Sequence, residues 1–317
     1  MTSAPTPANI PAISGSTIAD LVASGAAALT AAGVAFGHGT ATAEDESAWL
    51  TLWKLGLPLD SELAPGAPES LASQPVSAEQ QAEVAALFAE RIRTRKPAAY
   101  LTREAWLQGV PFYIDERSIV PRSLIAELLA DGSIDDWLSD KTRLVLDLCT
   151  GNGSLACLAA MASPDVQVTG ADLSADALAV ARINVDQHGL QERVQLVQSD
   201  GMANARGPWD LILCNPPYVN AQSMASLPLE YQAEPVLALA GGEDGMDFVR
   251  GLILELPQRL SEDGVLVLEI GNERAFFEAA FPGLPVFWMD TSAGDDQVLL
   301  LTREALMHWS QEQPTQL

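Results

Sequence analysis

The chain has 317 residues, 48% of them hydrophobic, and its 17 Lys and Arg against 42 Asp and Glu give a formal net charge of −25. This length fits about two domains with sizeable cores. The acidic excess argues against a surface that neutralises many phosphates, because such a surface needs clusters of Lys and Arg. It is typical of a soluble, self-repelling protein and also suits a basic partner. The three cysteines and three histidines lack disulfide or metal-ligand spacing, so we expect no metal site.

The Ala-rich stretch 18–36 resembles a signal or membrane segment only superficially. It contains Asp20, is broken by Gly25 and Gly33, and has no basic region before it. These features indicate a helix of a globular protein. We therefore expect a cytoplasmic protein that has no membrane contact.

The first hundred residues have the pattern of a helical domain. Thr17 and Asp20 resemble a capping box at the start of the first helix. Two further helices are expected over 44–55, stopped by Pro58, and over 77–95, ended before Pro97. We predict a helical domain over residues 1–97 that recognises the substrate.

The pattern changes after residue 97. Alternating apolar residues around Gly109 predict a β-hairpin linker over 98–120. Residues 121–317 then alternate between strands and helices, which predicts an α/β domain with a mostly parallel sheet covered on both faces. The expected strands are 143–149, 166–171, 194–198, 211–214, 265–270, 285–289 and 297–301, and the expected helices are 154–161, 175–188, 245–260 and 272–281.

A glycine turn follows the first of these strands. In such sheets a ligand binds at the carboxyl ends of the strands, and glycines let the backbone approach it closely. The turn does not match the G-x-G-x-x-G pattern of dinucleotide sites, and a plain structural turn remains an alternative. The candidate cofactor-binding residues of this segment are Asp147, Cys149, Thr150, Gly151, Asn152 and Gly153.

Acidic residues end the next two strands. Asp172 lies one βα unit after the glycine turn, where a carboxylate can accept both ribose hydroxyls of an adenosine ligand. Asp200 follows the third strand, where a carboxylate can accept from an adenine amino group. Either residue alone is as well explained by a solvated strand end, but three strand ends in order favour a cofactor site.

The sequence Asn215-Pro216-Pro217-Tyr218 follows the apolar strand that ends at Cys214. The prolines fix the backbone and remove two donors, which leaves a rigid corner rich in acceptors. The side-chain oxygen of Asn215 and the carbonyl of Pro216 can both accept from one NH2 group, and Tyr218 offers it a flat face. Such a corner holds a planar nitrogen with its lone pair aimed at an electrophilic methyl group. A tight turn with a core tyrosine is the alternative.

An amide nitrogen needs no strong base before such an attack, because its proton becomes acidic only after alkylation. Orientation alone lowers a barrier by up to roughly 7–11 kcal/mol. We therefore assign Asn215, Pro216 and Tyr218 as catalytic residues and no general base. Asn215 would also lie against the cofactor.

The order of glycine turn, strand-end Asp and Asn-Pro-Pro-Tyr resembles that of class I, Rossmann-like methyltransferases, whose sheet has seven strands. The flanking motifs are similar to those of the protein-(glutamine-N5) methyltransferase family over nearly the whole chain. This resemblance implies S-adenosylmethionine as cofactor and a glutamine side-chain amide as substrate, with Asn215, Pro216, Pro217, Tyr218 and Arg122 binding the substrate. The motifs that carry it are Tyr100–Thr102, Phe112–Tyr113, Val120–Arg122, Glu230–Tyr231, Glu234–Pro235, Leu239–Gly245 and Leu268–Gly271.

Within this family the chain resembles the branch that methylates the third protein of the large ribosomal subunit. Phe36–Gly39, Glu104–Trp106, Pro121–Ser123 and Leu148–Thr150 carry this narrower likeness. The likeness implies a basic ribosomal protein as partner, and an acidic enzyme surface would be complementary to it in charge.

The chain also departs from the family pattern at several positions. Arg103 stands where the family usually has Gly, which puts the hairpin turn in doubt. Asn152 replaces a commoner Ser or Thr, and Gly201-Met202 replaces bulkier residues near adenine.

Three other functions are also compatible with the sequence. The release-factor branch of the family shares all of the chemistry. A nucleic-acid amino methyltransferase shares the corner, but a DNA enzyme grips phosphates with a basic face, so we expect no DNA partner. A non-catalytic assembly factor could keep the fold, although an intact Asn215 and Asp172 speak against it.

Overall fold

The computed structural model describes residues 10–312 and divides into two compact units. One unit comprises the chain up to Glu104 together with Pro228–Ala233, and the other comprises Ala105–Leu227 and the chain from Glu234 onward. The expected boundaries at residues 97 and 120 stay predictions. The sequence analysis did not foresee that Pro228–Ala233 belongs to the helical unit.

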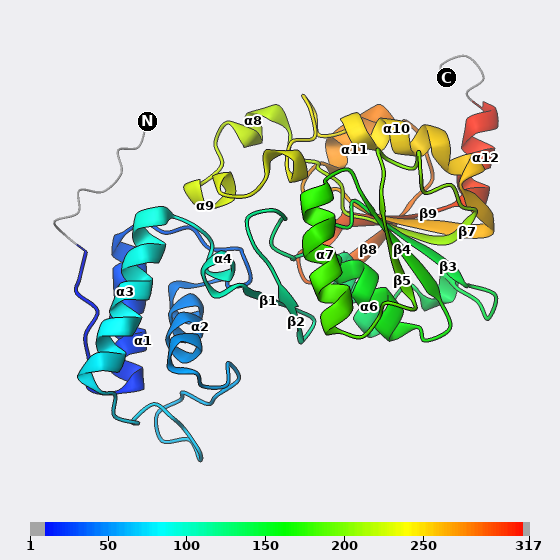
Figure 1. Ribbon diagram of the computed structural model, residues 1–317. Helices are drawn as coiled ribbons and strands as arrows, with labels where there is room; N and C mark the ends of the chain where they lie inside the picture. Colours follow the sequence, from blue (N-terminus) through cyan, green and yellow to red (C-terminus); the bar gives the residue numbers. More distant parts are fainter. Residues whose placement is uncertain (1–9, 313–317) are drawn as a thin grey trace. The chain divides into compact units, whose positions relative to one another are not determined.

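The helical unit is built on three helices around one apolar core. These are α1 (Ile18–Ala31), α2 (Ala43–Leu55) and α3 (Ala78–Thr94), followed by the short α4 (Ala98–Thr102) (Figure 1). Thr17 and Asp20 form the expected capping box, so the predicted start of α1 is confirmed. The helix α2 ends at Leu55, as predicted, but the left-handed C-cap Gly56 stops it, two residues before Pro58.

A buried arginine organises this unit. Arg91 of α3 is 0% exposed and its Nε donates to Glu46 of α2 at 2.8 Å. It also pairs with Glu230 of α9 (Leu229–Gln232) at 3.3 Å, and Nε of Arg95 lies 2.6 Å from the same carboxylate. Because a buried charge is tolerated only when paired, these contacts fix α9 within the helical unit.

Three residues with positive φ shape the start of the hairpin and its turn. Arg103, with φ +60°, ends α4, so Tyr100–Thr102 is helical and not part of the predicted hairpin. Strands β1 (Glu104–Leu107) and β2 (Val110–Tyr113) then pair across Gln108-Gly109, both of which have positive φ. Such a two-residue turn matches the twist of paired strands, so the predicted hairpin is confirmed.

The other unit contains a seven-stranded sheet of order β5-β4-β3-β6-β7-β9-β8. The first five strands in this order are parallel, whereas β9 is antiparallel to both β7 and β8. The predicted mostly parallel seven-stranded sheet is therefore confirmed. The strands are β3 (Leu144–Leu148), β4 (Gln167–Asp172), β5 (Val194–Gln198), β6 (Trp209–Cys214), β7 (Leu260–Glu269), β8 (Phe287–Thr291) and β9 (Gly294–Thr302).

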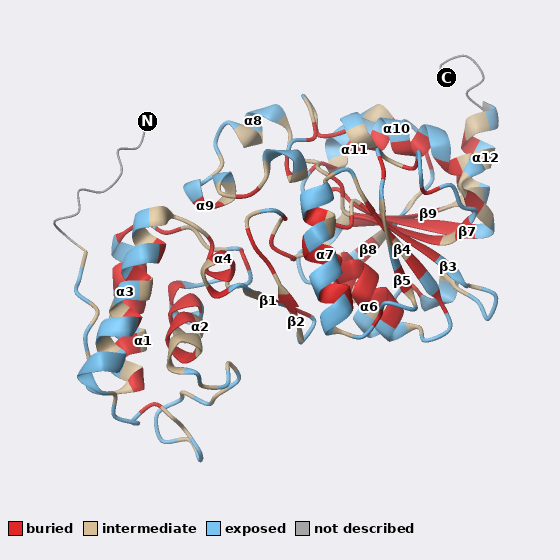
Figure 2. Cartoon of the chain, in the orientation of Figure 1, coloured by how far each residue is buried: buried red, intermediate tan, exposed pale blue. Residues whose placement is uncertain are grey.

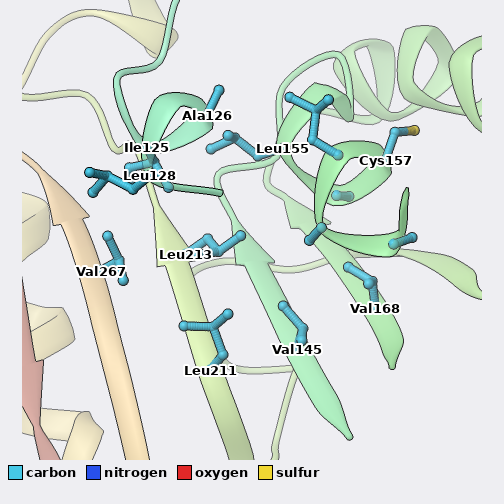
Figure 3. Packing of buried hydrophobic residues seen from close by; sticks show 14 of the residues in the cluster. Ile125, Ala126, Leu128, Val145, Leu155, Cys157, Val168, Leu211, Leu213 and Val267 are labelled. Carbon is cyan, nitrogen blue, oxygen red and sulfur yellow. The ribbon is translucent and has the colours of Figure 1, made fainter. Parts of the chain in front are cut away.

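Helices cover both faces of this sheet, as the continuous apolar strands require. Alternate strand residues, such as Leu211 and Ile212, belong to two different buried clusters. One cluster includes residues of α5 (Ile125–Asp131), α6 (Ser154–Ala162) and α7 (Ala175–Gln187) (Figure 3). The other includes residues of α10 (Asp247–Glu255), α11 (Arg274–Ala280) and α12 (Arg303–Glu312). The central strands are accordingly buried along most of their length (Figure 2).

Short helical segments complete the chain: α8 (Ala221–Met224) and the 3-10 turns Asp135–Trp137, Val236–Ala238 and Leu256–Gln258. Over residues 10–312, no helix is both long and apolar enough to span a membrane.

Candidate active site

The strand order creates a switch point between β3 and β6. From β3 the chain continues to β4 and β5 on one side, whereas β6 and β7 lie on the other side. The parallel registers align Leu148 with Ala171 and with Cys214, so the carboxyl ends of these strands share one edge of the sheet. Ligands bind at this edge in open α/β sheets. The fold thus brings the glycine turn, Asp172 and the Asn215 corner to one edge, as predicted.

The glycine turn leaves β3 in a run of left-handed conformations. Cys149, Gly151 and Gly153 have φ of +63°, +56° and +78°. The amide of Thr150 donates to the carbonyl of Ala171 at 3.0 Å, which holds the turn against β4. Gly153 directly precedes α6, so the turn leads into the N-terminus of this helix. This is the arrangement that the sequence predicted for Gly151 and Gly153.

Asp147 lies beneath the turn and is 1% exposed. Its Oδ2 accepts from the Thr150 hydroxyl at 2.5 Å and from the Ala156 amide at 2.9 Å. Its Oδ1 has no hydrogen-bond partner in the described part of the chain, and neither has Nδ2 of buried Asn152. Burial raises the pKa of Asp147 to about 7, despite the opposing hydrogen bonds from Thr150 and Ala156. An acceptor and a donor of the turn therefore remain unsatisfied.

Asp172 ends β4 beside the turn. Its Oδ2 accepts from the Gly151 amide at 2.9 Å and its Oδ1 from the Ser174 amide at 2.8 Å. Burial raises the pKa of Asp172, and these amide contacts oppose that rise. A carboxylate has about four acceptor positions, so these two hydrogen bonds do not fill the acceptor capacity of Asp172. Asp200 lies after β5 and is exposed, and Met202 nearby is buried.

The corner after β6 leaves its key acceptors available. Asn215 is half-buried, and its side-chain amide makes no hydrogen bond within residues 10–312. The carbonyl of Pro216 accepts none there either. The next residues are fixed by Val219, whose amide donates to Leu239 at 2.9 Å and whose carbonyl accepts from Gly241 at 2.9 Å. The corner is therefore held by its flanks, while its two acceptors stay open.

Two buried glutamates brace this corner, and the sequence did not reveal their roles. The Tyr218 hydroxyl donates to Oε1 of Glu269 at 3.2 Å, and Nδ2 of Asn220 donates to Oε1 of Glu273 at 2.7 Å. Glu269 is 3% exposed and Glu273 is 7% exposed. The motif Leu268–Gly271 was visible in the sequence, but only the pairing of β6 with β7 places it beside the corner.

Arg122 is engaged with a third glutamate. Its two terminal nitrogens lie 2.7 and 2.8 Å from the two carboxylate oxygens of Glu234, and Oε1 of Glu234 also accepts from the Val120 amide at 3.0 Å. This bidentate geometry fixes the guanidinium. Substrate binding by Arg122 stays a prediction, and the structure adds Glu234 as its partner.

The same regions match known proteins. Residues 134–270 match the model of the "Methyltransferase small domain" family. The ribosomal protein uL3 glutamine methyltransferase of Burkholderia pseudomallei is 50% identical, over 95% of this chain and 97% of the relative. The chain belongs to the ribosomal protein uL3 glutamine methyltransferase family. Members from Bordetella pertussis and Neisseria gonorrhoeae are 50% and 46% identical, each over 92% of this chain and 96% of the relative.

Membership of the uL3 glutamine methyltransferase family confirms the resemblance inferred from the motifs. The chain is a methyltransferase, and its α/β domain has the class I fold that was expected.

Proposed function

We propose that this chain transfers the methyl group of S-adenosylmethionine to the side-chain amide nitrogen of a glutamine in ribosomal protein uL3. The observation that carries this proposal is the open acceptor pair of Asn215 and Pro216 beside the glycine turn. The names of the relatives support the choice of substrate. A ribosomal protein is met in the cytoplasm, where we place the enzyme.

The residues at the edge of the sheet fit S-adenosylmethionine. The free acceptor positions of Asp172 suit ribose hydroxyls, and Asp200 remains our candidate for the adenine amino group. The unsatisfied Oδ1 of Asp147 suits a cationic ligand, whose charge would offset the cost of burying a carboxylate. When bound, S-adenosylmethionine supplies an electrophilic methyl group on a sulfonium.

The corner acts on the glutamine amide by orientation. Asn215 Oδ1 and the Pro216 carbonyl each accept one N–H of the substrate NH2, which turns the nitrogen lone pair toward the methyl group. Tyr218 covers the flat face of the amide. The nitrogen would take the methyl group that the bound sulfonium supplies and would then release one proton to water, so no general base is assigned.

An assay with two purified substrates tests this function. We expect labelled S-adenosylmethionine to methylate uL3 on a glutamine identified by mass spectrometry, and peptide release factor to stay unlabelled. Labelling of the release factor alone would overturn the choice of substrate. Labelling of neither, with intact cofactor binding in calorimetry, would overturn glutamine methylation.

The Asn215→Ala variant tests the corner. We expect kcat to fall by about 10²-fold or more, as when one key hydrogen-bonding group of an active site is removed. Affinity for S-adenosylmethionine, measured by calorimetry, should stay nearly unchanged. A loss of cofactor affinity with unchanged kcat would contradict the role of Asn215.

The Asp172→Ala variant tests the cofactor site, with Asp210→Ala as its matched control. Asp210 also accepts from two backbone amides, those of Arg143 and Leu144, but at the opposite ends of the strands. We expect Asp172→Ala to weaken cofactor binding by about tenfold or more, the equivalent of one or two lost hydrogen bonds to a charged group. Asp210→Ala should leave binding intact. Equal affinities in both variants would place the ribose elsewhere.

A further inference from the structure

Glu269 lies where the corner meets the neighbouring strand. It ends β7, and the register pairs Leu268 with Cys214, the residue directly before Asn215. The Tyr218 hydroxyl donates to its Oε1 at 3.2 Å. Glu269 therefore touches the side chain that we place against the substrate amide, without itself belonging to the acceptor pair.

The second oxygen of Glu269 is fixed independently. Its Oε2 accepts from the Ser123 hydroxyl at 2.6 Å and from the Leu124 amide at 2.9 Å. With the side chain 3% exposed, these contacts replace water as the partners of the carboxylate. One oxygen is thus anchored to the segment before α5, and the other is directed at Tyr218.

The tyrosine is also confined along its ring and main chain. A Cβ at Gly271, whose φ is +54°, would lie 2.6 Å from Cε2 of Tyr218. A Cβ at Gly241 would lie 2.7 Å from its Cα, and one at Gly245 would lie 2.3 Å from its carbonyl oxygen. At three glycines the backbone therefore packs directly on Tyr218. Within the side chain of Tyr218, only the hydroxyl needs a polar partner.

We propose that Glu269 is a positioning residue for methyl transfer, which acts through the Tyr218 hydroxyl to hold the ring against the substrate amide. This inference rests on the proposed function of the corner. Burial raises the pKa of Tyr218, so the phenol stays protonated and serves as the donor of this contact. A ring free to rotate would lose the alignment on which amide attack depends, and small misplacements reduce rates strongly.

Three variants separate positioning from general stabilisation. Glu269→Met removes the acceptor, whereas Glu269→Gln can keep its oxygen toward Ser123 and donate from its NH2 to the Tyr218 oxygen. Tyr218→Phe keeps the flat ring but removes the hydroxyl. We expect Glu269→Met to lower kcat by about tenfold or more with little change in KM, and Glu269→Gln to restore most of the rate.

The matched control is Glu127→Met. Glu127 of α5 likewise accepts from a serine hydroxyl and a backbone amide, both of Ser292, at 2.6 and 2.8 Å. This variant should leave kcat unchanged at a temperature where the protein is folded. An equal fall in kcat for Glu127→Met and Glu269→Met would assign both effects to stability and overturn the proposal.

A double-mutant cycle tests the route through the phenol. In the Tyr218→Phe background no hydroxyl remains for Glu269 to hold, so Glu269→Met should change kcat by less than about twofold. The loss of the Ser123 contact will still lower the melting temperature there. If Glu269→Met lowers kcat equally in both backgrounds, Glu269 does not act through Tyr218.

Fluorine NMR detects the contact between Tyr218 and Glu269 independently of catalytic activity. The chain has four tyrosines, and Tyr218→Phe assigns the Tyr218 signal of protein labelled with 3-fluorotyrosine. We expect that signal to shift in Glu269→Met, while the other three stay in place. An unmoved signal would overturn the contact. If the NMR effect is seen but wild-type protein does not methylate uL3, the proposed function fails while the contact stands.

Discussion

At the scale of single residues, Cys149 and Arg103 are among the non-glycine residues whose backbone conformations favour glycine. Cys149 opens the glycine turn at φ +63°, and Arg103 ends α4 at φ +60°. The resemblance put the hairpin turn at Arg103 in doubt, and in the structure the arginine itself adopts the left-handed conformation. The left-handed conformation costs an L-residue about 1–2 kcal/mol. Both residues therefore carry local strain.

The Cys149→Gly variant should be more stable than the wild type. Relief of about 1–2 kcal/mol, less about 0.5–1 kcal/mol for the greater freedom of unfolded glycine, leaves a net gain of up to about 1.5 kcal/mol. Urea unfolding measures this change. Cys157→Gly, in the interior of α6, should do the opposite and lose at least about 1 kcal/mol. The same sign for both variants would contradict the strain at Cys149.

Asp147 makes the free energy of unfolding depend on pH. Its ordinary pKa of 3.8 is raised to about 7 in the folded state, so between these values the folded state binds the proton more tightly than the unfolded state. The free energy of unfolding must then fall as pH rises through this window, by at most about 1.4 kcal/mol per pH unit for one group. Asp147→Asn, which mimics the protonated acid, should flatten this slope in denaturation of the cofactor-free protein. Parallel curves for the two proteins would show that Asp147 does not titrate there.

At the scale of elements, one arginine connects three helices of the helical unit. Arg91 of α3 pairs with Glu46 of α2 and Glu230 of α9, and all three side chains are buried. Burial raises the pKa of Glu46, while Arg91 opposes that rise. Such a network adds little net stability compared with an apolar core, but the loss of one member leaves a buried charge unpaired.

Arg91→Met should therefore destabilise the protein by about 3–5 kcal/mol. Glu230 keeps Arg95 as a partner, so Glu46 is the carboxylate that loses its arginine. Adding Glu46→Gln should therefore recover much of the loss. Thermal and chemical unfolding followed by circular dichroism measure both changes. A double variant no more stable than Arg91→Met would mean that packing, and not charge, sets the effect.

The elements that the sequence predicted are those with strong local signals. The strands of the sheet carry continuous apolar runs, and α1 begins with the predicted capping box. The structure shows a second capping box at the start of α3, formed by Ser77 and Gln80. The helix α5 lacks a side-chain cap, and α8 and α9 have only four residues each, too few for a helical period. The roles of Glu269 and Glu273 depend on strand pairing, which no local pattern contains. The acceptor pair was predictable because proline chemistry is local.

At the scale of the whole molecule, the charge of −25 predicts electrostatic steering of a basic substrate. We expect kcat/KM for uL3 to decline as salt rises, because the Debye length is about 10 Å at 0.1 M ionic strength and shorter above it. A short neutral peptide that contains the target glutamine is the control, and its kcat/KM should change little. A uL3 rate that is indifferent to ionic strength would rule out steering.

The segment Pro228–Ala233 limits how this protein can be dissected. Because α9 belongs to the helical unit, a fragment that stops at Glu104 lacks the Glu230 carboxylate and leaves Arg91 with one fewer counter-ion. Chimeras between relatives must therefore exchange two separate stretches, the first hundred residues and this hexapeptide, to transplant the helical unit intact. A single crossover therefore cannot exchange the helical unit as a whole.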